Sequence, residues 1–227
     1  MDIREAVPGD NDSLQALQDK CPQGTDLIVS VVNTPDFFAR AKAYESYRVF
    51  LASKGNQILG SMACGLRNAT IGGEVKRIAY GFQDFVAPEH RRRGIARKLH
   101  QVREEYAAQQ GAELFYTCVI EKNIPAMRYM ENQGFTCHCT AVMPALPVYK
   151  KMPIPSVINM RTAQPEDLPA IADLLNNTWQ GFELFEPASG EGLFQFISST
   201  PGYQLDNLMV LEDRGEISAF IGYMDWS

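Results

Sequence analysis

The chain has 227 residues, of which 45% are hydrophobic, so it is long enough for one large domain or two small ones with a buried core. No apolar run reaches the length of a membrane span and the charged start lacks a signal-peptide apolar region, so we expect a cytoplasmic protein without a membrane partner. Its 21 basic and 27 acidic side chains give a net charge of −6, which argues against general nucleic-acid binding.

The first 150 residues alternate between strands and helices in the order of a mixed α/β sheet that contains a strand–helix–strand crossover. In chain order, strands or helices are predicted at residues 2–6, 14–21, 47–51, 58–60, 78–86, 94–110, 114–120, 125–133 and from Phe135 on. The segment 114–120 is nearly all apolar, which is typical of a strand buried on both faces.

Five cysteines at irregular spacing argue against a disulfide framework. Cys137, His138 and Cys139 bring three metal-ligand side chains together, but a tetrahedral zinc site needs about four ligands, usually from two separated pairs. The sequence contains no second pair, so we predict no metal site and interpret the three residues as part of a strand.

The segment from residue 159 onward resembles the opening of the chain. Residues 159–163 match the strand at 2–6, and an amphipathic helix pattern follows in both places. A strand–turn–strand pattern then recurs, with turns at 54–56 and 213–215. We therefore predict a partial internal repeat with a period of about 157 residues, and two unrelated strand–helix openings are the alternative.

The joint between the two segments is rich in proline, which fixes φ and interrupts regular pairing. The prolines are Pro144, Pro147, Pro153 and Pro155. We predict two domains, a complete one at residues 1–153 and a partial one at residues 154–227.

The stretch most informative about function is the loop before the helix at 94–110. A helix N-terminus carries free N–H groups and the positive end of the helix dipole, so it binds anions. Gly94 lets a pyrophosphate approach the backbone, and Arg91, Arg92 and Arg93 add positive charge. An exposed basic turn before an ordinary helix is the alternative. The loop has neither the three spaced glycines of a dinucleotide fingerprint nor the Gly-Lys-Ser/Thr of a Walker loop.

Two motifs in the usual order resemble those of the GNAT acetyltransferases. The family hallmark at a strand-to-helix turn is Gln/Arg-x-x-Gly-x-Gly/Ala, and residues 91–96 read Arg-Arg-Arg-Gly-Ile-Ala after Val-Ala-Pro at 86–88. The second element is Asn-x-x-Ala followed by Gly-Phe, which matches residues 123–126 and 134–135. The resemblance covers residues 2–150 fully and the second segment in part. The double layout is similar to the tandem-domain subgroup that includes the plant hookless acetyltransferases.

The resemblance implies an α/β fold, with a mixed central sheet whose parallel strands splay apart between flanking helices, followed by a partial second GNAT-like repeat. It also implies acetyl-coenzyme A (acetyl-CoA) as the cofactor, with its pyrophosphate on the loop amides and its pantetheine arm along the end of the preceding strand. Asn123 is expected near the pantetheine, and capping of the following helix is its alternative role. The residues implied in cofactor binding are Phe85, Val86, Arg91, Arg92, Arg93, Gly94, Ile95, Ala96, Arg97 and Asn123.

For the chemistry, the resemblance implies direct attack of a neutral amine on the thioester in a ternary complex. Asp84 is the candidate proton acceptor, with Glu89 or a merely structural role for Asp84 as alternatives. Many family members place a proton-donating tyrosine four residues after the alanine of the second motif, where this chain has Met130. Tyr129 is about 100° round the helix from that position, so we expect it to face elsewhere.

The second segment ends before any loop like that at 91–97, so we expect it to lack a cofactor site. Either the chain is a piece of a longer tandem protein, or half a domain persists as a packing module. An unpaired sheet edge in that half invites pairing with another chain, and a homodimer is one outcome.

We therefore predict an acetyl-CoA-dependent N-acyltransferase that acts on a small-molecule or peptide amine. A non-catalytic acyl-CoA binding or sensing module is the alternative, and nucleic-acid binding through Arg91–Arg93 is disfavoured by the acidity of the chain. The acceptor region is expected at about residues 10–43, where Phe37, Phe38 and Arg40 either line a pocket or belong to an ordinary helix.

Overall fold

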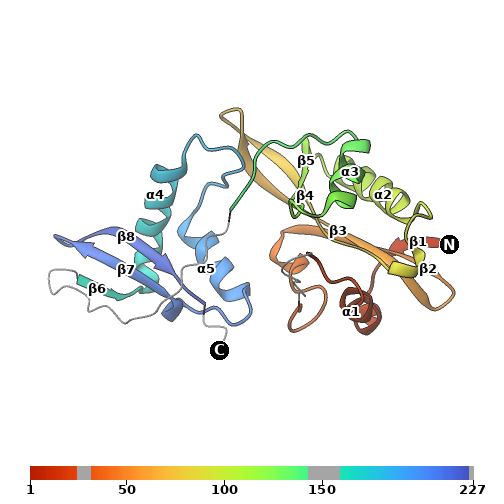
Figure 1. Ribbon diagram of the computed structural model, residues 1–227. Helices are drawn as coiled ribbons and strands as arrows, with labels where there is room; N and C mark the ends of the chain where they lie inside the picture. The colour runs from red at the N-terminus through yellow and green to blue at the C-terminus, as the bar shows by residue number, and fades with distance from the viewer. Residues whose placement is uncertain (25–31, 143–158, 225–227) are drawn as a thin grey trace.

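The computed structural model describes residues 1–24, 32–142 and 159–224, which form two units lying side by side (Figure 1). Each unit is built on its own sheet. The predicted boundary between residues 153 and 154 lies outside the described residues, as does the proline-rich joint around it. None of the helices in the described part of the chain is long and apolar enough to cross a membrane.

The first unit is a five-stranded sheet in the order β1-β2-β3-β4-β5. Its main elements are, in chain order, β1 (Asp2–Glu5), α1 (Asn11–Asp19), β2 (Ser46–Lys54), β3 (Gln57–Ile71), β4 (Glu74–Val86), α2 (Ile95–Gln109), β5 (Leu114–Thr117) and α3 (Ile124–Asn132). Neighbouring strands from β1 to β4 are antiparallel, and β4 and β5 are parallel because α2 carries the chain back across the sheet. The predicted mixed α/β sheet with one crossover is confirmed.

Side chains alternate along the long strands and give the sheet two apolar faces. On the face that we call the α1 face, Val49 and Leu51 pack against α1 and Phe37. On the opposite α2 face, Phe50 and Met62 pack against α2. The apolar stripe predicted for this helix is confirmed, because four of its residues contribute to the α2-face core: Ile95, Leu99, Val102 and Tyr106.

Two strand predictions, one for β5 and one for the residues after α3, differ from the structure. The strand expected over 114–120 spans only Leu114–Thr117, and none of its residues is fully buried. Among the described residues no strand pairs with its outer side, so β5 is an edge strand. The strand expected from Phe135 is absent from residues 135–142, because residues 136–142 are exposed and the alternation of Cys137, Cys139 and Ala141 with polar residues buries no face. Phe135 instead packs its ring 5.9 Å from that of Phe115.

The second unit is a three-stranded antiparallel sheet in the order β6-β7-β8. Its main elements are β6 (Asn159–Thr162), α4 (Leu168–Trp179), α5 (Gly190–Ser199), β7 (Leu208–Asp213) and β8 (Glu216–Gly222). Its small core joins the sheet to the two helices through Leu168, Ile171, Ile197 and Val210. The strand order and directions match those of β1, β2 and β3.

Both units enter their first helix through the same arrangement of side chains. In the first unit, Asp10 accepts hydrogen bonds of 2.7 and 2.8 Å from Arg4 and one of 2.8 Å from the backbone N–H three residues before it. In the second unit, Asp167 accepts bonds of 2.6 and 3.0 Å from Arg161 and one of 2.7 Å from the corresponding N–H. In both units the guanidinium lowers the pKa of the aspartate.

The two units touch where β3 extends beyond β2. A stretch of the second unit, residues 182–186, which we call the docking segment, lies along this free end. The backbone N–H of Thr70 donates to the carbonyl of Phe185 at 2.7 Å, and the N–H of Leu184 donates to the carbonyl of Thr70 at 2.9 Å. The docking segment therefore pairs with β3 as a short additional strand does.

Side chains reinforce this backbone pairing. The guanidinium of Arg67 on β3 donates to the carbonyl of Leu184 at 3.1 Å and lies 3.8 Å from the carboxylate of Glu186. The carboxylate of Glu183 accepts from the N–H of Gly72 at 3.0 Å. The second unit thus reaches the first unit through one polar contact region at the β3–β4 hairpin.

Candidate active site

Strands β4 and β5 lie at one edge of the sheet and diverge part-way along β4. They pair from Ile78 opposite Leu114 to Gly81 opposite Thr117, and the hydroxyl of Thr117 donates to the carbonyl of Gly81 at 2.9 Å. Beyond this point β4 continues to Val86, whereas β5 ends. Pairing between the two parallel strands therefore ends at Gly81, where the family resemblance implies that they splay apart.

Past the divergence, β4 contains a bulge. The register with β3 shifts beside Ser61, and Gln83 adopts the left-handed conformation with φ of 54°. The hydroxyl of Ser61 donates to the carbonyl of Gln83 at 3.3 Å, and the side chain of Gln83 donates to the carbonyl of Phe37 at 2.8 Å. In a regular strand Asp84 would share the α1 face with Phe82, and the bulge turns it toward α2 instead.

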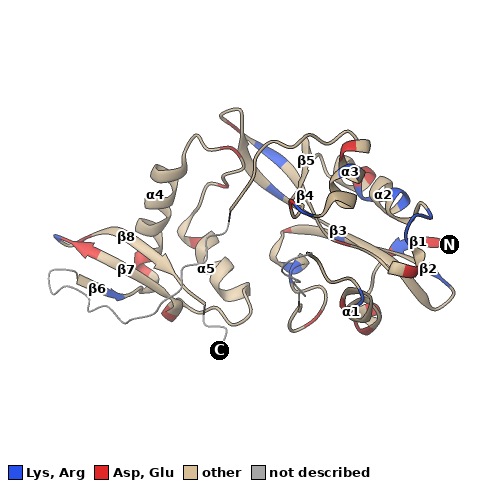
Figure 2. Cartoon of the chain, viewed as in Figure 1, with Lys and Arg blue, Asp and Glu red and all other residues tan. Residues whose placement is uncertain are grey.

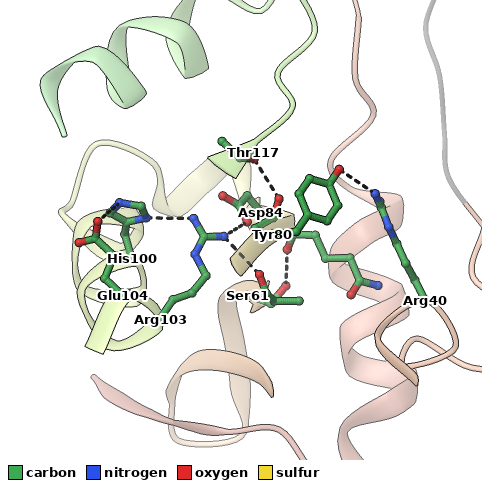
Figure 3. Close-up of polar contacts among 11 residues, drawn as sticks. Arg40, Ser61, Tyr80, Asp84, His100, Arg103, Glu104 and Thr117 are labelled. Carbon is green, nitrogen blue, oxygen red and sulfur yellow. Dashed lines mark hydrogen bonds and ion pairs between the residues drawn. The ribbon is translucent and has the colours of Figure 1, made fainter. Parts of the chain in front are cut away.

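Asp84 is joined to buried polar residues of α2 (Figure 3). Its carboxylate forms an ion pair with the guanidinium of Arg103, whose side chain is fully buried. Arg103 also donates to the carbonyl of Ala63 at 3.4 Å and contacts Nδ1 of His100 at 2.9 Å. Nε2 of His100 lies 3.3 Å from the half-exposed carboxylate of Glu104. A row of polar groups therefore runs from the surface of α2 to the bulge of β4.

Burial and one guanidinium set the protonation states in this row. Burial raises the pKa of Asp84, and Arg103 opposes that rise. Burial and then Arg103 lower the pKa of His100 to about 4, so the imidazole is neutral near pH 7 and its Nδ1 accepts from Arg103. Oδ2 of Asp84 is buried and has no hydrogen-bond partner in the described part of the chain. One carboxylate oxygen is thus held by Arg103, and the other has no partner among the described residues.

The loop between β4 and α2 presents backbone amides at its end. A 3₁₀ turn at Pro88–His90 leads into the exposed arginines 91–93. Gly94 caps α2 with φ of 76°, and a Cβ placed there would meet no atom within 4 Å. The amide of Lys98 donates to the carbonyl of Gly94 at 3.2 Å as the first regular bond of the helix, which leaves the preceding amides for an anion. Figure 2 marks basic residues in blue at this end of α2, and their positive charge fits a pyrophosphate.

Two side chains contact the carbonyl of the last residue of β4. Nε of Arg91 donates to the carbonyl of Val86 at 3.1 Å, and Sγ of Cys21 contacts the same oxygen at 3.5 Å. Phe85 is buried in the α1-face core and Ile95 in the α2-face core. These two residues therefore offer only their backbone groups to a ligand. On the first turn of α2, residue 96 is half-buried and residue 97 is exposed.

Asn123 occupies the N-cap position of α3. Its Oδ1 accepts from the backbone N–H of Ala126 at 3.3 Å. Of the two roles considered for this residue, helix capping is the one that the described contacts support.

Helix α3 turns Tyr129 toward the same buried charges. Its ring centroid lies 6.1 Å from that of His100, and its hydroxyl is buried without a hydrogen-bond partner among the described residues. Burial raises the pKa of Tyr129 to about 12, Arg103 opposes the rise and Asp84 adds to it. Met130 is also buried. We expected Tyr129 to face elsewhere. In the structure its ring instead packs beside His100, and the charges of Arg103 and Asp84 affect its pKa.

Sequence reasoning missed His100 and Arg103. They lie one position round α2 from Leu99 and Val102, so helical periodicity assigns them to the flank of the apolar stripe. A signal was nevertheless present, because Asp84 stands in an apolar strand that this helix covers. A buried carboxylate requires a partner, and an arginine beside the stripe of the covering helix is the natural candidate.

The two exposed cysteines of the Cys-His-Cys stretch belong to no group of metal ligands among the described residues. The thiol of Cys137 lies 3.8 Å from the carbonyl of Cys139. Across residues 1–24, 32–142 and 159–224, no three His, Cys, Asp or Glu side chains are grouped so that they could hold a metal ion.

The family resemblance associates two parallel strands that part before an anion-binding helix N-terminus with acyl-CoA-dependent transferases. The model of the acetyltransferase (GNAT) family matches residues 12–135, which is more than half of the chain. The chain therefore belongs to the GNAT family of acetyltransferases. No curated protein matches it in sequence.

Solved structures share the fold at low identity. A transcriptional regulator from Bacillus halodurans C-125 is 18% identical, with a TM-score of 0.53 over 64% of this chain and 99% of its own. A putative acetyltransferase from Agrobacterium tumefaciens str. C58 is 18% identical, with a TM-score of 0.51 over 64% of this chain and 100% of its own. The aminoglycoside 6'-N-acetyltransferase AAC(6')-IG from Acinetobacter haemolyticus is 18% identical, with a TM-score of 0.50 over 65% and 99%. These likenesses establish the fold of the first unit.

Proposed function

We propose that the first unit is an acetyl-CoA-dependent N-acetyltransferase that acts on a small-molecule or peptide amine. The observation that carries this proposal is the position of the β4–β5 divergence, directly before the loop whose amides open α2. A structure with the same fold, the aminoglycoside N-acetyltransferase AAC(6')-Iy, was solved in complex with coenzyme A and has a TM-score of 0.50. This relative supports a coenzyme A site in the fold.

The donor site is assigned to the loop and the strand before it. The amides of residues 92–97 would bind the pyrophosphate, with the guanidinium groups of residues 91–93 as counter-charges. The backbone of Phe85 and Val86 would hold the pantetheine arm in the manner of an added strand. Arg91 must release the carbonyl of Val86 for this, because its Nε already donates to that oxygen. Asn123 fixes the start of α3 at the other side of the divergence.

The thioester supplies an activated acetyl group, and the protein positions the acceptor and takes up its proton. The amine nitrogen forms a bond to the acetyl carbon, the carbon–sulfur bond breaks, and the sulfur keeps the electron pair. The nitrogen loses one proton, for which the unpartnered Oδ2 of Asp84 is the candidate acceptor. The hydroxyl of Tyr129 is the candidate donor to the departing sulfur, because its raised pKa keeps it protonated.

A non-catalytic acyl-CoA binding or sensing module is the second candidate. It is favoured by the ion pair between Asp84 and the buried Arg103, which stabilises the carboxylate as a structural partner. The amine assays below separate the two, since only the transferase releases thiol in proportion to added amine.

We further propose that the second unit is a partial GNAT-like repeat of a tandem-type protein. The matched strand order of the two sheets supports this, and so does the recurrence of the Arg4–Asp10 arrangement at Arg161 and Asp167. A cytoplasmic location and a homodimer remain predictions.

The full chain should be titrated with acetyl-CoA by calorimetry and then assayed with a panel of amines for thiol release and acetylated product. We expect micromolar binding and amine-dependent thiol release. No binding heat and no thermal shift at millimolar acetyl-CoA would contradict the assignment of the donor site. Binding without turnover of any amine would favour the sensing module.

A further inference from the structure

Four aromatic rings, which we call the aromatic cluster, lie on the α1 face at the β4–β5 divergence. They belong to Tyr44, Tyr80, Phe82 and Tyr116, and neighbouring rings stack with centroid distances of 4.8, 5.4 and 5.6 Å. The ring of Tyr44 fills the space over Gly65, where any Cβ would overlap it. The three tyrosines are only half-buried, so the cluster forms a partly open wall beside the reaction centre.

Three guanidinium groups lie over aromatic rings near this point, and two of them are neutralised. Arg103 lies 5.0 Å from a ring centroid on the α2 face and is paired with Asp84. Arg67 lies 5.6 Å from a centroid of the aromatic cluster and is paired with Glu186 of the docking segment. Arg40 lies 4.9 Å from another centroid of the cluster, and no carboxylate pairs with it among the described residues. Figure 3 shows Arg40 and Arg103 on opposite sides of β4.

Arg40 is held in place, while most of its donors have no partner in the described part of the chain. Its guanidinium spans Phe82 and Tyr80, at 4.9 and 5.6 Å from their centroids, and donates to the hydroxyl of Tyr80 at 3.1 Å. A guanidinium has five N–H donors, and this bond uses one. The side chain is exposed on the face that α2 and its cofactor loop leave open. A planar fork of this kind binds a carboxylate through two parallel hydrogen bonds.

We propose, on the basis of the N-acetyltransferase function above, that the acceptor is an amine carrying a carboxylate, and that Arg40 determines this specificity. The carboxylate pairs with Arg40, the body of the acceptor lies on the aromatic cluster, and the amine reaches the divergence next to Tyr80. A polycationic acceptor is disfavoured, because Arg40, which has no carboxylate partner among the described residues, would repel it. Amino acids and the C-terminal parts of short peptides belong to the class that fits.

The test compares L-amino acids with their primary amides, which keep the shape and the amine but lose the negative charge. With the full chain and saturating acetyl-CoA, we expect kcat/KM to be at least 10-fold higher for the acids than for the amides. In the Arg40→Gln variant the KM for the acids should rise by roughly 10- to 100-fold, as loss of a charge-assisted pair implies. The KM for acetyl-CoA and the rates with the amides should stay unchanged.

Arg48→Gln is the matched control. Arg48 is also an exposed arginine over a tyrosine, at 5.4 Å from the centroid of Tyr106, but it lies on the α2 face and is paired with Glu5. It should keep the preference for acids. Equal use of acids and amides by the parent chain, or an unchanged preference in Arg40→Gln, overturns the inference and leaves the acetyltransferase function standing. If the parent chain acetylates no amine at all, the proposed function and this inference are both overturned.

Discussion

Gly94 determines, at the scale of a single residue, whether an anion can approach the start of α2. Its φ of 76° is unfavourable for other residues, and the space beyond its Cα is open. We expect Gly94→Glu to abolish acetyl-CoA binding by calorimetry, because the carboxylate would occupy the anion site. Gly111→Glu is the matched control, since Gly111 ends the same helix with φ of 78° and equally open space. Equal binding by both variants would show that the loop is not the pyrophosphate site.

Asp84 combines a chemical and a structural role, and two variants separate them. Asp84→Asn should lower turnover by about 10²-fold or more and destabilise the fold by about 3–5 kcal/mol, because it leaves the buried Arg103 unpaired. Adding Arg103→Met should restore the melting temperature. If turnover returns with stability in the double variant, Asp84 only holds Arg103. If turnover stays low, the carboxylate takes part in proton transfer.

His100 makes stability depend on pH. Its folded pKa of about 4 lies below the usual 6.5, so below pH 6.5 the unfolded chain binds a proton that the folded chain does not. Stability should therefore fall as pH decreases from 6.5 to 4, by up to about 3 kcal/mol. Urea unfolding at each pH measures this loss. In His100→Gln the loss over the same window should shrink. An identical slope would mean that burial and Arg103 do not keep the imidazole neutral.

The elements show where sequence patterns suffice. Helix α2 and its apolar stripe are predictable, because the apolar spacing over residues 95–106 and Gly111 are local signals. The loop of the candidate site is predictable for the same reason. The bulge at Gln83 is not, since it arises from the register between β3 and β4 rather than from any local pattern. The ion pair of Asp84 depends on that bulge, so its partner was missed as well.

Helix α3 offers a direct test of the proton donor. Tyr129→Phe removes a buried hydroxyl that has no hydrogen-bond partner among the described residues. Because no hydrogen bond is lost with it, the melting temperature should stay unchanged or rise. Turnover should fall by about 10-fold or more. Tyr106→Phe removes another hydroxyl from the α2 face and should leave turnover unchanged. Full activity of Tyr129→Phe would show that the thiolate leaves without an acid.

At the scale of the whole molecule, the first unit holds the complete candidate site and its own core. A chain cut after residue 153 should therefore keep native-like circular dichroism and bind acetyl-CoA with an affinity close to that of the full chain. Its melting temperature should be lower, because the bonds from Thr70 and Arg67 to the docking segment are lost. A molten product that binds no acetyl-CoA would show that the two units fold as one.

The docking segment also hides a sheet edge. Beyond Leu66, where pairing with β2 ends, β3 continues to Ile71, and the N–H and C=O of Thr70 bond to the second unit. Without that cover, the hairpin would present an open edge on which a second molecule can add a strand. The second unit thus covers a sheet edge at which molecules could associate. We expect the shortened chain to fold but to aggregate in concentrated solution.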